Sequence, residues 1–164
     1  MVETRIESRP GFNVIGCKTW IGGEGNEEFG SFWAERRRNG VLDELAALRG
    51  DTPGPLTNAM LLGLSAVERD PTDRRFHFYI AAESTATLAG SHLEAVSVPA
   101  SRWAVFRNCG RMPDALVAAE MYAFGEWLPA SAYVHAKAPK MEVYPPANRA
   151  PDVLCEFWQP VTRA

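Results

Sequence analysis

The order of strand-like and helix-like segments occurs twice along this chain, and that repeat restricts the folds open to it. In the first half, a strand pattern over residues 12–18 precedes a helical pattern, and two further strands are expected over residues 61–68 and 75–83. In the second half, strand patterns over residues 93–99 and 102–108 precede a helical pattern over residues 113–128 and strands over residues 140–144 and 153–161. Turn residues separate the segments, whose hydrophobic spacing alternates between the strand period and the helix period.

The two units span about residues 1–90 and 91–164, and each is too small to close a hydrophobic core alone. Each unit therefore has to pair with its twin, as the units of internal repeats do. We predict an α+β fold of duplicated β-α-β-β units related by pseudo-twofold symmetry, with an antiparallel sheet. All 164 residues would then form a single domain.

The first predicted helix accounts for the most basic stretch of the sequence. Phe29 and Trp33 lie one turn apart on its apolar face, and two glutamates at residues 27–28 occupy its first turn. Three consecutive arginines at residues 36–38 fall in its last turn, where cations complement the helix dipole. A second, shorter helix is expected over residues 41–48. The arginines are thus explained without a ligand.

The charge balance argues against nucleic acid as a partner. With 17 basic and 20 acidic residues, the chain carries a formal net charge of −3 and has no general attraction for phosphate backbones. Every predicted helix is needed in the repeated unit, so none remains for a helix-turn-helix. We therefore expect no DNA-binding domain.

Targeting, metal and cofactor signals are also missing from the sequence. No window approaches the roughly 20 apolar residues of a membrane helix, and the start lacks a signal peptide's basic and apolar regions. We expect a cytoplasmic protein without a membrane partner. Cys17, Cys109 and Cys155 are widely spaced in apolar surroundings, which favours buried free thiols. The histidines lack ligand spacing and no glycine-rich phosphate loop follows a strand, so we expect neither metal nor cofactor.

The strand expected over residues 140–144 carries the clearest candidate binding residues. Its two-residue period places Glu142 and Tyr144 on one face, opposite two apolar side chains. A carboxylate buried on such a face needs a cation, a hydrogen-bond donor or a raised pKa. The alternative is an edge strand on which Glu142 meets water beside Lys140 and Tyr144 merely covers core. The spacing leaves both interpretations open.

A second acidic candidate lies in the strand expected over residues 75–83. Tyr79 shares a face there with His77, Ala81 and Glu83, whereas the other face is fully apolar. A face of this kind fits either solvent or a lined cleft. Glu83 is therefore kept as a candidate beside Glu142.

Seven short motifs occur along almost the whole chain, at residues 10–16, 32–33, 76–82, 98–106, 127–133, 141–144 and 157–161. Among them are Pro-Gly-Phe-Asn near the start, Phe-Trp in the first helix and Met-Glu-Val-Tyr near the end. In this order they resemble the GyrI-like effector-binding domains, the ligand-sensing module of AraC-type and MerR-type multidrug regulators and of stand-alone proteins. The resemblance implies the duplicated fold inferred above.

The resemblance also implies a cleft between two helices and the sheet, lined by aromatic rings, with an acid at its base that receives lipophilic cations. Carried over by position, the acid is Glu142 and its neighbour is Tyr144, while Tyr79 and Trp33 line the cleft. Phe29, one turn before Trp33, is a further candidate wall. Cations stack favourably on such rings. Ordinary core packing remains the alternative for each aromatic residue.

Two departures from the family pattern and two other functions accompany this prediction. Ala82 stands where the family often has glycine, and residues 50–59 do not align with it. Some relatives with this fold open the strained cyclopropane of genotoxic natural products, so hydrolysis with Glu142 as general base is an alternative. Inhibition of DNA gyrase by protein contact is a second alternative, disfavoured by the small net charge. The natural ligand and the pairing of chains into a homodimer are left open.

Overall fold

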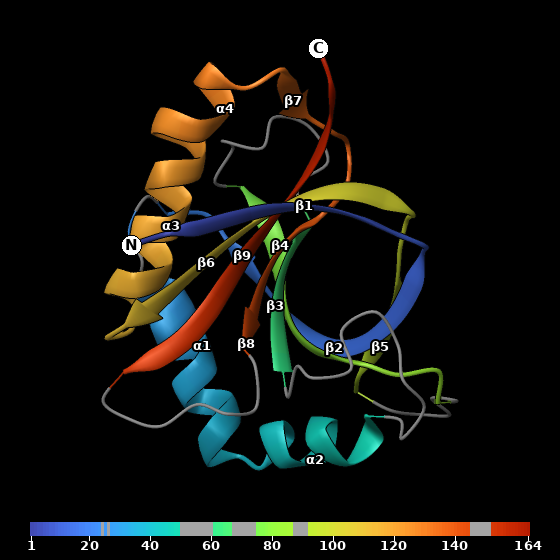
Figure 1. The fold of residues 1–164 in the computed structure, drawn as a ribbon. Coiled ribbons are helices and arrows are strands. Elements are labelled where there is room, and N and C mark those ends of the chain that lie inside the picture. The colour runs from blue at the N-terminus through green and yellow to red at the C-terminus, as the bar shows by residue number, and fades with distance from the viewer. Residues whose placement is uncertain (24, 26, 50–60, 67–74, 87–91, 145–151) are drawn as a thin grey trace.

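The structure, a computed structural model, describes residues 1–23, 25, 27–49, 61–66, 75–86, 92–144 and 152–164 (Figure 1). Its strands are β1 (Glu3–Arg9), β2 (Phe12–Ile21), β3 (Leu61–Ala66), β4 (Phe76–Glu83), β5 (Glu94–Val98), β6 (Ser101–Gly110), β7 (Tyr133–His135), β8 (Lys140–Tyr144) and β9 (Val153–Arg163). Its helices are α1 (Glu27–Arg38), α2 (Val41–Leu48), α3 (Asp114–Tyr122), the π-helical segment η1 (Ala123–Trp127) and α4 (Leu128–Ala130). Residues 50–59 and the predicted end of the third strand, residues 67–68, lie outside the described residues.

One antiparallel sheet combines strands from both halves of the chain. Its order is β1-β6-β9-β8-β3-β4-β2-β5, and β7 pairs with β9 beside this path. Exchanging β1 with β5, β2 with β6, β3 with β8 and β4 with β9 returns the same order read backwards. The predicted pseudo-twofold symmetry is therefore confirmed, and its axis passes between β3 and β8.

Each half lends its first strand to the other half. β1 pairs with β6, from Glu3 opposite Arg107 to Arg9 opposite Ser101, and β5 pairs with β2 in the same manner. The repeated unit is thus β-β-α-β-β. Both opening strands of the second half were predicted, but β1, the matching strand of the first half, was not. The sequence analysis missed β1 because its side chains are mostly charged or polar and half-exposed, as is usual in an edge strand.

One face of the sheet carries a core drawn from strand residues alone. At one side of the sheet, β2 bends through a wide arc (Figure 1). This core consists of Phe12, Val14, Leu62, Leu64, Ala81, Val98, Trp103, Val105, Met141, Val143 and Trp158. We call this side of the sheet the strand-core face.

The helices cover the opposite face in two separate groups. One buried cluster joins α1 and α2 to β2 and β4, with Leu45, Phe76 and Phe78 among its members. The other joins α3, η1 and α4 to β6 and β9, with Phe106 and Phe157 among its members. Since β3 and β8 lie between these strand pairs, they form a seam between the two helix groups. The cleft that the sequence analysis predicts between two helices and the sheet would lie at this seam.

Local predictions agree closely with the structure. The predicted bounds of α2 and β8 match, and the predicted second-half helix continues from α3 through η1 into α4. Cys17 and Cys155 are buried as expected, but Cys109 is exposed, so that part of the thiol prediction is wrong. Within the described residues, no helix is long and apolar enough to cross a membrane.

Candidate ligand-binding site

β8 supplies the floor of the seam between the helix groups. Met141 and Val143 belong to the buried core on the strand-core face. Because side chains alternate along a strand, Glu142 and Tyr144 face the helices, and Tyr144 packs against the cluster beneath α3. β8 is paired on both sides, with β3 and with β9, so the alternative of an edge strand is wrong.

The Glu142 side chain lies over a glycine of the neighbouring strand. Gly63 of β3 is directly opposite Glu142 in the antiparallel register. A Cβ atom added at Gly63 would lie 2.5 Å from Glu142 Cγ and 2.7 Å from its Cδ. The missing side chain of Gly63 therefore provides the space that the carboxyl group occupies.

Glu142 is enclosed by protein and yet keeps part of its surface accessible. Burial raises its pKa to about 8, and the charge of Glu120 on α3 adds to the rise. Hydrogen bonds with the Tyr144 hydroxyl and the Trp33 indole, together with the charge of Lys140, act in the opposite direction. The carboxyl group is therefore desolvated but partly accessible, and with a pKa of about 8 it is mostly protonated at pH 7.

Two aromatic side chains meet above the carboxyl group. The ring centroids of Trp33 and Tyr144 are 5.8 Å apart and their planes are perpendicular, at 90°. Burial and the neighbouring Glu142 raise the pKa of Tyr144, so its hydroxyl keeps its proton and can donate it in a hydrogen bond. The structure thus brings Glu142, Tyr144 and Trp33 together as predicted.

Phe29 extends the same wall along α1. Its ring lies 4.9 Å from that of Phe78 and 6.2 Å from that of Phe76, measured between centroids. Both partners belong to the cluster beneath α1 and α2. Phe29 therefore lies on the α1 side of the seam, one turn away from Trp33.

Tyr79 and Glu83 do not reach this seam. Tyr79 packs against the strand-core face, and its hydroxyl donates a hydrogen bond of 3.4 Å to Glu94. Glu83 is an even number of residues further along β4 and so points to the same side. The prediction that Tyr79 lines the cleft of Glu142 is therefore wrong. The alternative of Glu83 as the acid of that cleft is wrong for the same reason.

The structure also brings residues to the seam that the sequence analysis did not propose. The Lys140 ammonium lies 5.9 Å from the ring centroid of Phe76 and 5.5 Å from that of Phe124. The sequence analysis placed Lys140 beside Glu142, but only in the alternative in which both meet water. For Glu120 and Phe124, periodicity assigns a helix but leaves their position over β8 undetermined.

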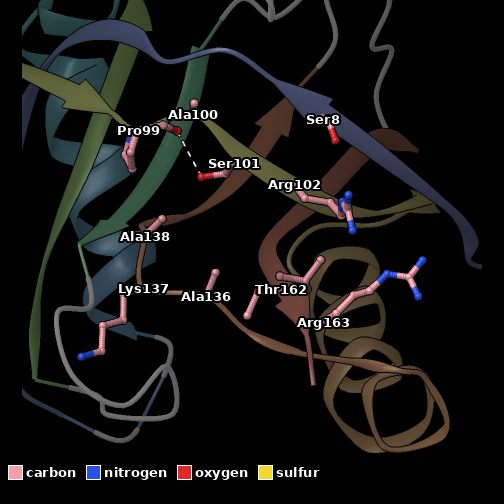
Figure 2. Close-up of a pocket in the computed structure, with 11 residues that line it drawn as sticks. Ser8, Pro99, Ala100, Ser101, Arg102, Ala136, Lys137, Ala138, Thr162 and Arg163 are labelled. Atoms are coloured by element: carbon pink, nitrogen blue, oxygen red, sulfur yellow. Dashed lines mark hydrogen bonds between the residues drawn. The ribbon is translucent and has the colours of Figure 1, made fainter.

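A separate cavity of about 590 Å³ lies between β1, the start of β6, the β7–β8 connection and the end of β9 (Figure 2). Its lining includes Arg102, Lys137 and Arg163 together with small side chains. Figure 2 shows the two arginines pointing the same way and Lys137 pointing to the other side. None of the predicted binding residues lines this cavity, so it is distinct from the seam around Glu142.

The chemistry of the seam is that of a protonatable acid among aromatic rings. Ionised, Glu142 would serve as counter-charge for a cation; protonated, it would donate a hydrogen bond. Across the described ranges, no group of three His, Cys, Asp or Glu side chains is suited to hold a metal ion.

Comparison with protein families gives one match over nearly the whole chain. Residues 2–162 match the family described as GyrI-like small molecule binding domain. A search of curated proteins finds no match.

Solved structures with the same fold include three of different description. SAV2435 bound to tetraphenylphosphonium has a TM-score of 0.81 at 20% identity, over 98% of this chain and 94% of that chain. The C-terminal domain of EcmrR has a TM-score of 0.71 at 14% identity, over 100% and 99% of the two chains. A hydrolase from Listeria innocua has a TM-score of 0.51 at 14% identity, over 98% and 92%. At these identities the likeness shows the fold alone.

Proposed function

Because the chain belongs to the GyrI-like small molecule binding domain family, we propose that it binds a lipophilic cation in the seam above β3 and β8. Glu142 supplies the counter-charge, Trp33 and Tyr144 supply aromatic surface, and Phe29 extends the α1 wall. The observation that carries the proposal is the Glu142 carboxyl group, which is desolvated and accessible and hydrogen bonds with two aromatic side chains.

Two physical terms favour a cation over a neutral ligand of the same shape. Stacking of a cation on a Trp or Tyr face contributes about 0.5 to 2 kcal/mol, more as water is excluded. The attraction between the cation and the Glu142 carboxylate also strengthens in a medium of low dielectric constant. Flat aromatic side chains can pack against ligands of many shapes, so we expect low selectivity for any one ligand shape.

Among the proteins of the same fold, SAV2435 has been solved with tetraphenylphosphonium bound. That ligand combines a delocalised positive charge with apolar rings, which is the chemistry proposed for this seam. Tetraphenylphosphonium is therefore the probe for testing this chain.

The first test is calorimetric titration of the protein with tetraphenylphosphonium. Glu142→Gln keeps the shape of the side chain and removes its charge, so we expect the affinity to fall roughly 10- to 100-fold, the range for losing one charge-assisted contact. Glu94→Gln is the matched control, because Glu94 pairs with Lys18 at 3.0 Å and contacts Tyr79 away from the seam. Equal weakening by both variants, or by neither, would contradict the proposal.

The same titration has a pH dependence that follows from the raised pKa of Glu142. Below about pH 8 the bound cation has to displace a proton, so we expect the affinity to rise roughly tenfold per pH unit from pH 6 to 7.5. Above pH 8 the affinity should level off. In Glu142→Gln the affinity should not change over this range.

Hydrolysis of a reactive hydrophobic compound is the second candidate. It is favoured by the pKa of Glu142, about 8, because a carboxyl group near neutrality can both accept and return a proton. The test incubates a strained cyclopropane-containing electrophile with the protein and analyses the products. Ring opening by water that is lost in Glu142→Gln would establish turnover, whereas recovery of unchanged compound leaves binding as the function.

A further inference from the structure

The seam already contains a cation of the protein itself. Lys140 lies in β8 two residues before Glu142, and both side chains extend from the same face of the strand. Opposite it in the register is Ser65 of β3, next but one to Gly63. The Lys140 side chain is half-buried and therefore begins inside the seam.

The Lys140 ammonium group lies between the two helix groups. Phe76 belongs to the cluster beneath α1 and α2, and Phe124 packs against the cluster beneath α3. The ammonium nitrogen is 5.9 Å from the first ring centroid and 5.5 Å from the second. Both distances lie within the reach of a cation–π contact, so one positive charge is shared by opposite walls.

The π-helical segment η1 is the element that presents Phe124 to this position. A π-turn widens the helix by one residue and changes the direction of the side chains that follow. Phe124 is the second residue of η1, and its ring also contacts Phe157 at 5.6 Å. The Phe124 ring is therefore packed against Phe157 of the sheet and also contacts the Lys140 ammonium group.

From this arrangement we infer that Lys140 occupies the cation position of the seam, and that a cationic ligand binds by displacing the Lys140 ammonium from Phe76 and Phe124. This inference rests on the proposed function of the same seam. Lys140 would then be the residue that selects ligands by charge and by hydration.

The character of the lysine side chain makes the displacement feasible. An ammonium group is compact and strongly hydrated, and its flexible four-carbon stem lets it move to solvent while the stem stays on apolar surface. A bulky cation with delocalised charge is weakly hydrated and covers more aromatic surface. Lipophilic cations should therefore displace Lys140, whereas small, well-hydrated ammonium ions should not.

Substitution of Lys140 by methionine tests the inference directly, because methionine keeps an unbranched stem and removes the charge. We expect Lys140→Met to bind tetraphenylphosphonium about tenfold more tightly than the wild type. Tetraphenylborate, which has the same shape and the opposite charge, should bind more weakly to Lys140→Met than to the wild type. Lys137→Met is the matched control: it changes the net charge equally, and Lys137 is exposed and lines the separate cavity.

The outcomes separate this inference from the proposed function. If Lys140→Met and the wild type bind tetraphenylphosphonium equally while Glu142→Gln binds it weakly, Lys140 does not hold the cation position and the inference is overturned. If Lys137→Met reproduces the effect of Lys140→Met, the effect is one of net charge and the inference also fails. If Glu142→Gln and the wild type bind alike, the proposed function fails instead.

A spectroscopic measurement keeps the test independent of how well the variant folds. The chain has only three lysines, Lys18, Lys137 and Lys140, so its lysine ε-CH₂ resonances are few. Ring currents of Phe76 and Phe124 should shift the Lys140 resonance upfield in the free protein. Saturating tetrabutylammonium, a lipophilic cation without rings, should return it to the ordinary lysine position. A resonance that stays shifted at saturation would show that the ammonium group is not displaced.

Discussion

At the scale of single residues, the proton of Glu142 is controlled by its surroundings. Burial and the charge of Glu120 favour the protonated acid, while Tyr144, Trp33 and Lys140 favour the carboxylate. Burial and Glu120 together have the larger effect, because the pKa of Glu142 rises to about 8. A ligand that brings a positive charge reverses this balance, so binding and proton release are expected to occur together.

The raised pKa predicts a pH dependence of stability. Between the ordinary value of 4.5 and about 8, folded Glu142 keeps a proton that the unfolded chain releases, so the free energy of unfolding falls as pH rises through this window. Relative to the wild type, Glu142→Gln should gain roughly 2 to 4 kcal/mol between pH 5 and pH 8.5. Urea unfolding at both pH values measures this gain. A constant difference between the two proteins would contradict the raised pKa.

At the scale of elements, the pairing of β3 with β8 builds the floor of the seam. Gly63 lies opposite Glu142, and Leu61 lies opposite Tyr144. The glycine matters because any side chain at that position would enter the volume of the Glu142 carboxyl group. The acid is thus held by a pair of strands from different halves of the chain, at the pseudo-twofold axis.

The Gly63 contact predicts a strong dependence on side-chain size. Gly63→Ala should destabilise the fold by about 1 to 3 kcal/mol through overpacking and should displace the carboxyl group. In a Glu142→Ala background the same substitution should cost little, because the atoms that clash are gone. Gly30→Ala in α1 is the control, since nothing lies within 4 Å of its added Cβ. Thermal unfolding of the four variants decides the prediction, and an unchanged cost in the double variant would refute it.

At the scale of the whole molecule, exchanged strands join the two halves. Glu156 of β9 accepts hydrogen bonds from Arg5 of β1 at 2.7 Å and from Arg107 of β6 at 3.0 Å. Its side chain is only 5% exposed, whereas the two arginines are near 40%. The indole of Trp158 donates a further hydrogen bond of 3.2 Å to Glu156. One buried carboxylate therefore ties the N-terminal strand to the second half.

The Glu156 network predicts how firmly the exchanged strand is held. Glu156→Gln removes the charge partner of Arg107 and one of the two partners of Arg5, which keeps its ion pair with Glu7, and we expect a loss of about 1.5 to 3 kcal/mol in the free energy of unfolding. Because the arginines lower the pKa of Glu156, its contribution is present above the ordinary pKa and is lost as pH falls.

Denaturant unfolding at pH 7 and pH 3 tests this prediction, and the difference between wild type and Glu156→Gln should shrink at the lower pH. The exposed pair of Lys18 and Glu94 provides the control, since Glu94→Gln should cost less than about 1 kcal/mol. Similar costs for the two variants would mean that β1 is not held by Glu156.

Much of the fold follows from periodicity and turn chemistry. The bounds of α2 and β8 and the shared face of Glu142 and Tyr144 were predictable, because they depend on residues near one another in the chain. β1 was not, because a charged edge strand has little hydrophobic pattern and is recognised only through its partner β6.

The candidate site was predictable only in part, and Tyr79 illustrates why. The two-residue period assigns Tyr79 to one face of β4 and Phe76 to the other, but it does not say which face the helices cover. The helices cover the face of Phe76, so the residue near the seam is a phenylalanine that looked like ordinary core, and Tyr79 lies on the far side.

Spacing and turn residues predict the local elements, their duplicated order and the presence of an acid and a tyrosine on one face of a strand. These properties depend on spacing along the chain and on the need of two small units to share a core. The folded arrangement of the sheet and helices shows in addition that Gly63 makes room for Glu142, that Trp33 meets Tyr144, and that Lys140 lies between Phe76 and Phe124. Such contacts join residues far apart in the chain, and long-range packing of helices on one face of the sheet selects them.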